Sequence, residues 1–217
     1  MITTPDLIES LVAGAKPVRR LRPPAVRAAL WLLFALAIVS LLAVSHGLRP
    51  DLGARLGEPL FVTGLAASLV TGVLAAVAAF IVSLPGRSRL SLLLPLPGLA
   101  LWISTISYGC LTAWASIRPD GVSLGEAVDC LATLVLTSVP LWLGLLLMLR
   151  HAALLFSAAV AVAGSLAVAA LAATALSLFH GLDASAMILM WNLGAAALLV
   201  GLGSAFGERM FSWVASR

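Results

Sequence analysis

Six long stretches without Asp, Glu, Lys, Arg or His constrain this chain more than any other feature of its sequence. Each contains between 18 and 28 residues, and about 18 apolar residues is the minimum for a helix that crosses a bilayer. The chain is 62% hydrophobic and 10% charged, whereas soluble domains carry about 25% charged residues. This composition excludes both a soluble globular domain and a disordered chain.

The stretches predict an all-α, polytopic membrane protein in which residues 28–217 form a bundle of six transmembrane helices. We expect the spans near 28–45, 60–83, 94–115, 130–149, 155–178 and 187–206. Pro95 and Pro97 would lie in the first turn of the third span, and Pro140 lies inside the fourth, where membrane helices tolerate it. The first span and the arm before it are too long for a cleaved signal peptide.

The few charged residues predict the orientation. Six spans place both termini on one side, and basic residues concentrate on the cytoplasmic side. With both termini inside, ten of the 13 Lys and Arg lie in the cytoplasm and six of the nine acids lie outside. The net charge of +4 therefore indicates orientation, and it gives no reason to expect direct binding of nucleic acid.

The cytoplasmic N-terminal arm, residues 1–27, contains one predicted amphipathic helix at 4–13. Thr4, Pro5 and Asp6 are typical of a helix start. The apolar residues that follow share one face and are Leu7, Ile8, Leu11 and Val12. A helix of about ten residues is unstable alone in water, so it must lie on another surface.

Two surfaces remain open for this helix. The first is the membrane, and the basic residues that would bind anionic headgroups are Lys16, Arg19, Arg20 and Arg22. The second is a groove on a partner protein. Asp6 and Glu9 argue against the membrane, because helices that lie on membrane surfaces are usually basic.

Four residues that bind metals or react with oxidants are expected near the outer face. Cys110 and Cys130 lie near the outer ends of the third and fourth spans, which we expect to form an antiparallel hairpin, and His46 and His180 end the first and fifth spans. They suit Zn or a heavy metal as soft ligands, or the thiols could be oxidised in the periplasm. Equally, the cysteines could be small buried hydrophobes and the histidines interfacial residues. No catalytic constellation is found, so no enzyme is predicted.

Several segments resemble the NrsF family of six-span bacterial inner-membrane proteins, which are negative regulators of extracytoplasmic-function sigma factors. The similar segments, in chain order, are PVRRLRPP (17–24), LRPDLGARL (48–56), SLPGRSR (83–89), LPLPGLALW (94–102), GC (109–110) and FHGLDASAMILMWNLG (179–194). Together they extend over essentially the whole chain.

The resemblance implies an anti-sigma factor in the bacterial cytoplasmic (inner) membrane that regulates transcription in a stress response. The residues it assigns to the sigma factor are Asp6, Leu7, Ile8, Glu9, Leu11 and Val12. It makes Cys110 and Cys130 the sensor of metal or redox stress, with His180 and His46 as further candidates. No cofactor is required, and Zn or a heavy metal would bind only transiently. The alternatives are a small transporter or lipid-binding membrane protein, and a structural subunit without a sensing role.

Overall fold

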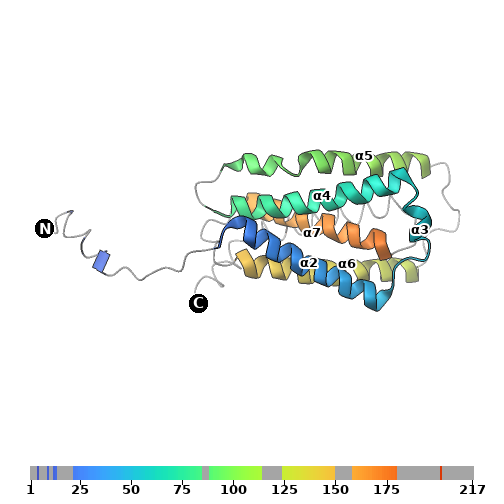
Figure 1. Ribbon diagram of the computed structural model, residues 1–217, viewed down its shortest axis with the longest axis horizontal. Helices are drawn as coiled ribbons and strands as arrows, with labels where there is room; N and C mark the ends of the chain where they lie inside the picture. Colours follow the sequence, from blue (N-terminus) through green and yellow to red (C-terminus); the bar gives the residue numbers. More distant parts are fainter. Residues whose placement is uncertain are drawn as a thin grey trace.

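The computed structural model describes residues 22–84, 88–113, 124–149 and 158–179, together with Thr4, Glu9, Val12, Ala13 and Gly201. All regular structure in these residues is helical, which confirms the predicted fold class. The elements are α2 (Pro24–His46), α3 (Leu52–Arg55), α4 (Pro59–Val82), the 3₁₀ helix η1 (Arg89–Leu93), α5 (Leu96–Ala113), α6 (Leu124–Leu149) and α7 (Ala158–Phe179) (Figure 1).

Five helical segments of the described chain are long and apolar enough to cross a membrane. They correspond to the first five predicted spans, and the third combines η1 with most of α5. The sixth predicted span, 187–206, lies outside the described residues except for Gly201, which is helical.

Two helix boundaries differ from those predicted. α2 begins at Pro24, inside the predicted arm 1–27, because proline suits the first position of a helix. α6 begins by Leu124 and includes Asp129, although the fourth span was predicted to start at residue 130. A span estimated from charge-free residues ends where the hydrocarbon ends, whereas the helix itself continues into the polar interface.

Helices α4 and α7 form the centre of the bundle, with α5 on one side and α2 and α6 on the other (Figure 1). Small residues allow the two central helices to approach closely, and the side chain of Leu171 lies against Gly72. The hydroxyls of Ser68 and Thr174 are 2.9 Å apart across this interface. The core beside it contains Trp31, Phe80, Leu141 and Val168, whose exposed fractions are all 0%.

Helices α5 and α6 do not form the packed hairpin that their order in the chain predicted. α5 packs on α4, whereas α6 packs on α7 and α2. Figure 1 shows α5 and α6 at opposite edges of the bundle, with α4 and α7 between them. The close contact at Gly98 explains the position of α5, because Thr71 of α4 fits against it.

Alternating helix directions give the bundle two ends. We call one the His46 end: α2, α5 and α7 end there, and α4 and α6 begin there (Figure 1). The other is the Pro24 end, where α2 begins and where α4 and α6 end. In the predicted orientation, the His46 end would face the periplasm and the Pro24 end the cytoplasm.

Candidate functional site

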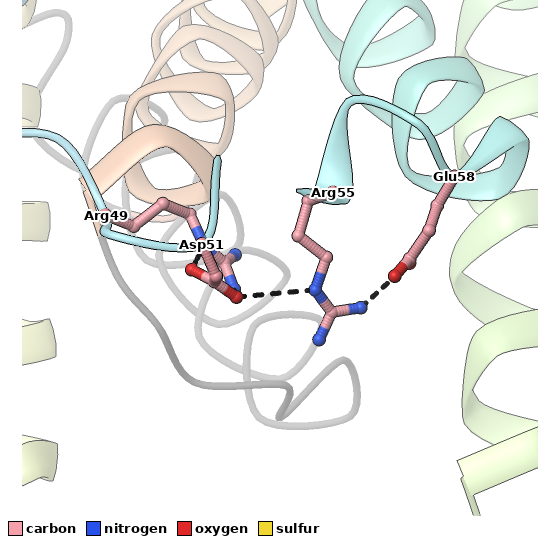
Figure 2. A network of polar contacts seen from close by, with 4 residues as sticks. All are labelled: Arg49, Asp51, Arg55 and Glu58. Carbon is pink, nitrogen blue, oxygen red and sulfur yellow. Dashed lines mark hydrogen bonds and ion pairs between the residues drawn. The ribbon is translucent and has the colours of Figure 1, made fainter. Parts of the chain in front are cut away.

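An alternating row of four charged side chains occupies the connection between α2 and α4 at the His46 end (Figure 2). Nε and Nη2 of Arg49 donate to the two carboxylate oxygens of Asp51, at 2.7 and 2.6 Å. Nη1 of Arg55 donates to Glu58 at 2.9 Å, and Nε of Arg55 lies 3.6 Å from Asp51. We call this row the outer latch, after the face that the predicted orientation gives to the His46 end.

Arg49 fastens the outer latch to the rest of the bundle. Its side chain is only 4% exposed, and its guanidinium lies 5.7 Å from the ring centre of Phe61 on α4. Its backbone N–H donates to the carbonyl of Leu178 in the last turn of α7, at 3.1 Å. One residue therefore joins the end of α2, the start of α4 and the end of α7.

The hydrogen bonds from Arg49 also set the ionisation of Asp51. They lower the pKa of this carboxyl from 3.8 to about 2, because they stabilise the ionised form. Asp51 is thus a carboxylate at neutral pH and below, down to strongly acidic conditions.

Three of the four predicted sensor residues lie on three different helices at the same end. His46 is exposed in the last turn of α2, and its Nδ1 lies 2.9 Å from the hydroxyl of Ser45. Cys110 belongs to the last turn of α5 and Cys130 to the first two turns of α6. Their side chains, and the whole of His180, lie outside the described residues. Within the described part of the chain, no group of three or more His, Cys, Asp or Glu could hold a metal ion.

The fold thus separates the helices of the two cysteines and brings others together. α6, which carries Cys130, packs against α2 and α7. His46 ends α2, and His180 directly follows α7. Cys110 belongs to α5, at the opposite edge of the bundle (Figure 1).

A second buried arginine, which the sequence indicated only as the boundary of the first span, lies at the Pro24 end. Arg27 is 6% exposed, and its guanidinium lies 5.2 Å from the ring centre of Phe80 on α4. Its Nη2 donates to the carbonyl of Met148 near the end of α6. Its Nη1 is buried without a hydrogen-bond partner among the described residues.

The predicted partner-binding helix and basic arm lie largely outside the described residues. Thr4, Glu9, Val12 and Ala13 are helical and exposed, and the side chain of Val12 is 69% exposed. Of the predicted lipid-binding residues, only Arg22 is described, and it is exposed just before α2. The other predicted residues of this arm are Asp6, Leu7, Ile8, Leu11, Lys16, Arg19 and Arg20.

Sequence reasoning missed the contacts of both buried arginines. The outer latch had a local signal, because Asp51 and Arg55 are four residues apart and Arg55 and Glu58 are three apart, as in helical ion pairs. Arg27 had none: its contacts with Phe80 and Met148 join residues that are far apart in the sequence.

These features define an all-helical membrane protein whose described spans carry charged residues only near their ends. The chain belongs to a particular family of such proteins: the NrsF family, negative regulator of sigma F, matches residues 11–213. This confirms the resemblance seen in the sequence, and the family is one of regulators rather than of enzymes. No curated protein and no solved structure matches the chain.

Proposed function

We propose that this chain is an anti-sigma factor that holds an extracytoplasmic-function sigma factor at the bacterial inner membrane. The observation that carries the proposal is the family match over residues 11–213, in a chain with five described helices able to cross a membrane. Held at the membrane, the sigma factor could not join RNA polymerase, and its genes would stay silent.

The amphipathic helix at 4–13 is the proposed contact with the sigma factor. Glu9 and Val12 are both exposed and helical. A short helix with an exposed apolar side chain such as Val12 gains stability when it binds a groove on a partner. Leu7, Ile8, Leu11 and Val12 would fill that groove, and Asp6 and Glu9 would face basic residues of the sigma factor.

The first experiment replaces both Leu7 and Leu11 with Asp. We expect the sigma factor to leave the membrane fraction and its target promoter to become constitutively active, because two charges cannot enter an apolar groove. The promoter activity and the sigma factor in membrane and soluble fractions are measured, with the membrane level of the variant determined by immunoblot.

A matched control places the same two charges on the opposite face of the helix. Ser10 and Ala13 lie about half a turn away from the apolar stripe, so S10D with A13D adds equal charge without touching it. This control should retain the sigma factor. If the Leu7 and Leu11 variant also retains it, the helix is not the contact.

We propose further that a metal ion or an oxidant at the periplasmic face releases the sigma factor. The packing of α6 against α2 and α7 favours a site that combines Cys130 with His46 and His180 over one that pairs Cys130 with Cys110. A disulfide requires Cα atoms within about 7 Å, and α5 and α6 occupy opposite edges of the bundle (Figure 1).

Single serine variants of the two cysteines test this proposal. C130S should retain the sigma factor but lose most of its induction by Zn, a heavy metal or an oxidant, and the double variant should behave in the same way. C110S should keep most of its response. Normal induction in the double variant would refute the thiol sensor, and equal loss in both single variants would restore the paired dithiol.

A further inference from the structure

Three contacts join α2 to α6 along the half of the bundle nearest the Pro24 end. Arg27 donates to the carbonyl of Met148, and Nε1 of Trp31 donates to the carbonyl of Leu141 at 3.1 Å. The ring of Phe34 lies so close to Gly144 that a Cβ there would be 2.8 Å from Cε1 of Phe34. We call these six residues the α2–α6 seam.

Helix α6 links the seam to the His46 end of the bundle. It carries Cys130 in its first two turns, passes Pro140, and ends with the residues of the seam. Proline removes one main-chain hydrogen bond and permits a helix to bend. The seam residues Leu141, Gly144 and Met148 all follow this proline, so the last turns of α6 can change their angle to the first.

Because the hydrogen bonding of Arg27 is incomplete among the described residues, we expect the seam to have a second arrangement. Its buried Nη1 lacks a partner among the described residues, and a buried donor without an acceptor carries a desolvation penalty. We expect a small displacement of α6 to bring this nitrogen to water or a headgroup phosphate. If no acceptor comes from the rest of the chain, this penalty narrows the free-energy difference between the packed seam and a more open one.

The first turn of α2 then connects the seam to the N-terminal arm. Arg27 is the fourth residue of α2, and Arg22 lies two residues before that helix begins. Any displacement of Arg27 and Trp31 by α6 therefore changes the direction in which the arm leaves the bundle.

We propose that the α2–α6 seam transmits the state of the outer part of α6 to the N-terminal arm. Opening the seam reorients the arm and releases what the arm holds. The release of the sigma factor rests on the proposed function, whereas the movement of the helices does not depend on it.

The test opens the seam with one methyl group. In G144A the new Cβ would lie 2.8 Å from Cε1 of Phe34, so the Phe34 ring must move and its contact with α6 is disturbed. G98A is the matched control, because its Cβ would be equally close, at 2.8 Å, to Oγ1 of Thr71, but in the α4–α5 interface. We expect the Kd for the sigma factor to rise at least tenfold in G144A and to stay within twofold in G98A. The probe is a purified extracytoplasmic-function sigma factor from the same genome, taken first from the neighbouring genes.

A second variant covers the case in which G144A does not fold. W31F keeps an aromatic ring at this position but removes the donation to Leu141, so it should raise the Kd about threefold or more. If the wild type binds the sigma factor and both seam variants bind it equally well, the role of the seam in transmission is refuted and the proposed function stands.

A third measurement needs no sigma factor. In inside-out membrane vesicles, trypsin cleaves the arm after Arg19 and Arg20, and the initial rate reports the exposure of the arm. We expect this rate to change at least threefold in G144A and to remain unchanged in G98A. Equal rates in the wild type and both variants would refute the seam even if the chain proved to bind no sigma factor.

Discussion

A buried arginine lies at each end of α2, Arg27 in its first turn and Arg49 three residues after its last residue, and their hydrogen bonding is complete to different degrees. Arg49, at the His46 end, forms two short hydrogen bonds to the carboxylate of Asp51 and stacks near Phe61. Arg27, at the Pro24 end, donates to one carbonyl, that of Met148, and lies over the ring of Phe80. Its Nη1 has no partner in the described part of the bundle.

This difference indicates which arginine holds its end of α2 more firmly. A paired, bidentate arginine holds its neighbours in one geometry. An arginine with an unpaired buried nitrogen stabilises its surroundings less, because part of its hydrogen bonding is lost on burial. We therefore expect Arg49 to hold its end of α2, the anchored end, more firmly than Arg27 holds the end that joins the N-terminal arm.

The largest expected effect is at the anchored end. R49M removes two charge-assisted hydrogen bonds, and we expect the free energy of unfolding to fall by about 2 kcal/mol. Denaturant titration in detergent micelles measures it. R55M is the control: the partners of Arg55 are about half exposed, so its loss should cost less than about 1 kcal/mol. Equal losses in the free energy of unfolding would show that burial does not increase the contribution of Arg49 to stability.

Arg27 should matter less for stability than Arg49 and more for regulation. R27M replaces a buried, incompletely paired charge with an apolar side chain of similar length, so the free energy of unfolding should change by about 1 kcal/mol or less. The same titration measures this change, and trypsin cleavage of the arm measures its exposure. A fall in the free energy of unfolding as large as that in R49M would show that Arg27 and Arg49 contribute equally to stability.

Much of the fold followed from the sequence, because crossing a bilayer requires long apolar helices and few charges. The positions of α2, α4, α5, α6 and α7 could be predicted in this way. The neighbours of each helix could not. Small contacts decide them, such as Thr71 against Gly98 and Leu171 against Gly72, and a chain rich in Ala, Gly and Leu offers many similar pairings.

The site was less predictable than the fold. The family was readable from short segments of the sequence, whereas the contact helix inferred from the stripe at Leu7 and Leu11 stays a prediction. The seam depends on Trp31 and Leu141, which are 110 residues apart. No periodicity within one segment reveals such a contact. The hairpin expected for the cysteine-bearing helices failed for the same reason, since chain order does not fix helix neighbours in a membrane.

The smallest expected effect concerns pH and the anchored end. Because the pKa of Asp51 is lowered from 3.8 to about 2 in the folded protein, its ion pair contributes fully above pH 3.8 and is lost as the pH falls through about 2. The difference in Tm between the wild type and D51N should therefore be constant from about pH 5 to 8 and shrink in stronger acid. A difference that changed between pH 5 and 8 would mean that another titrating group acts on the latch. Constancy would mean that mild acidification leaves the Asp51 ion pair intact, so that any response to it must arise elsewhere in the chain.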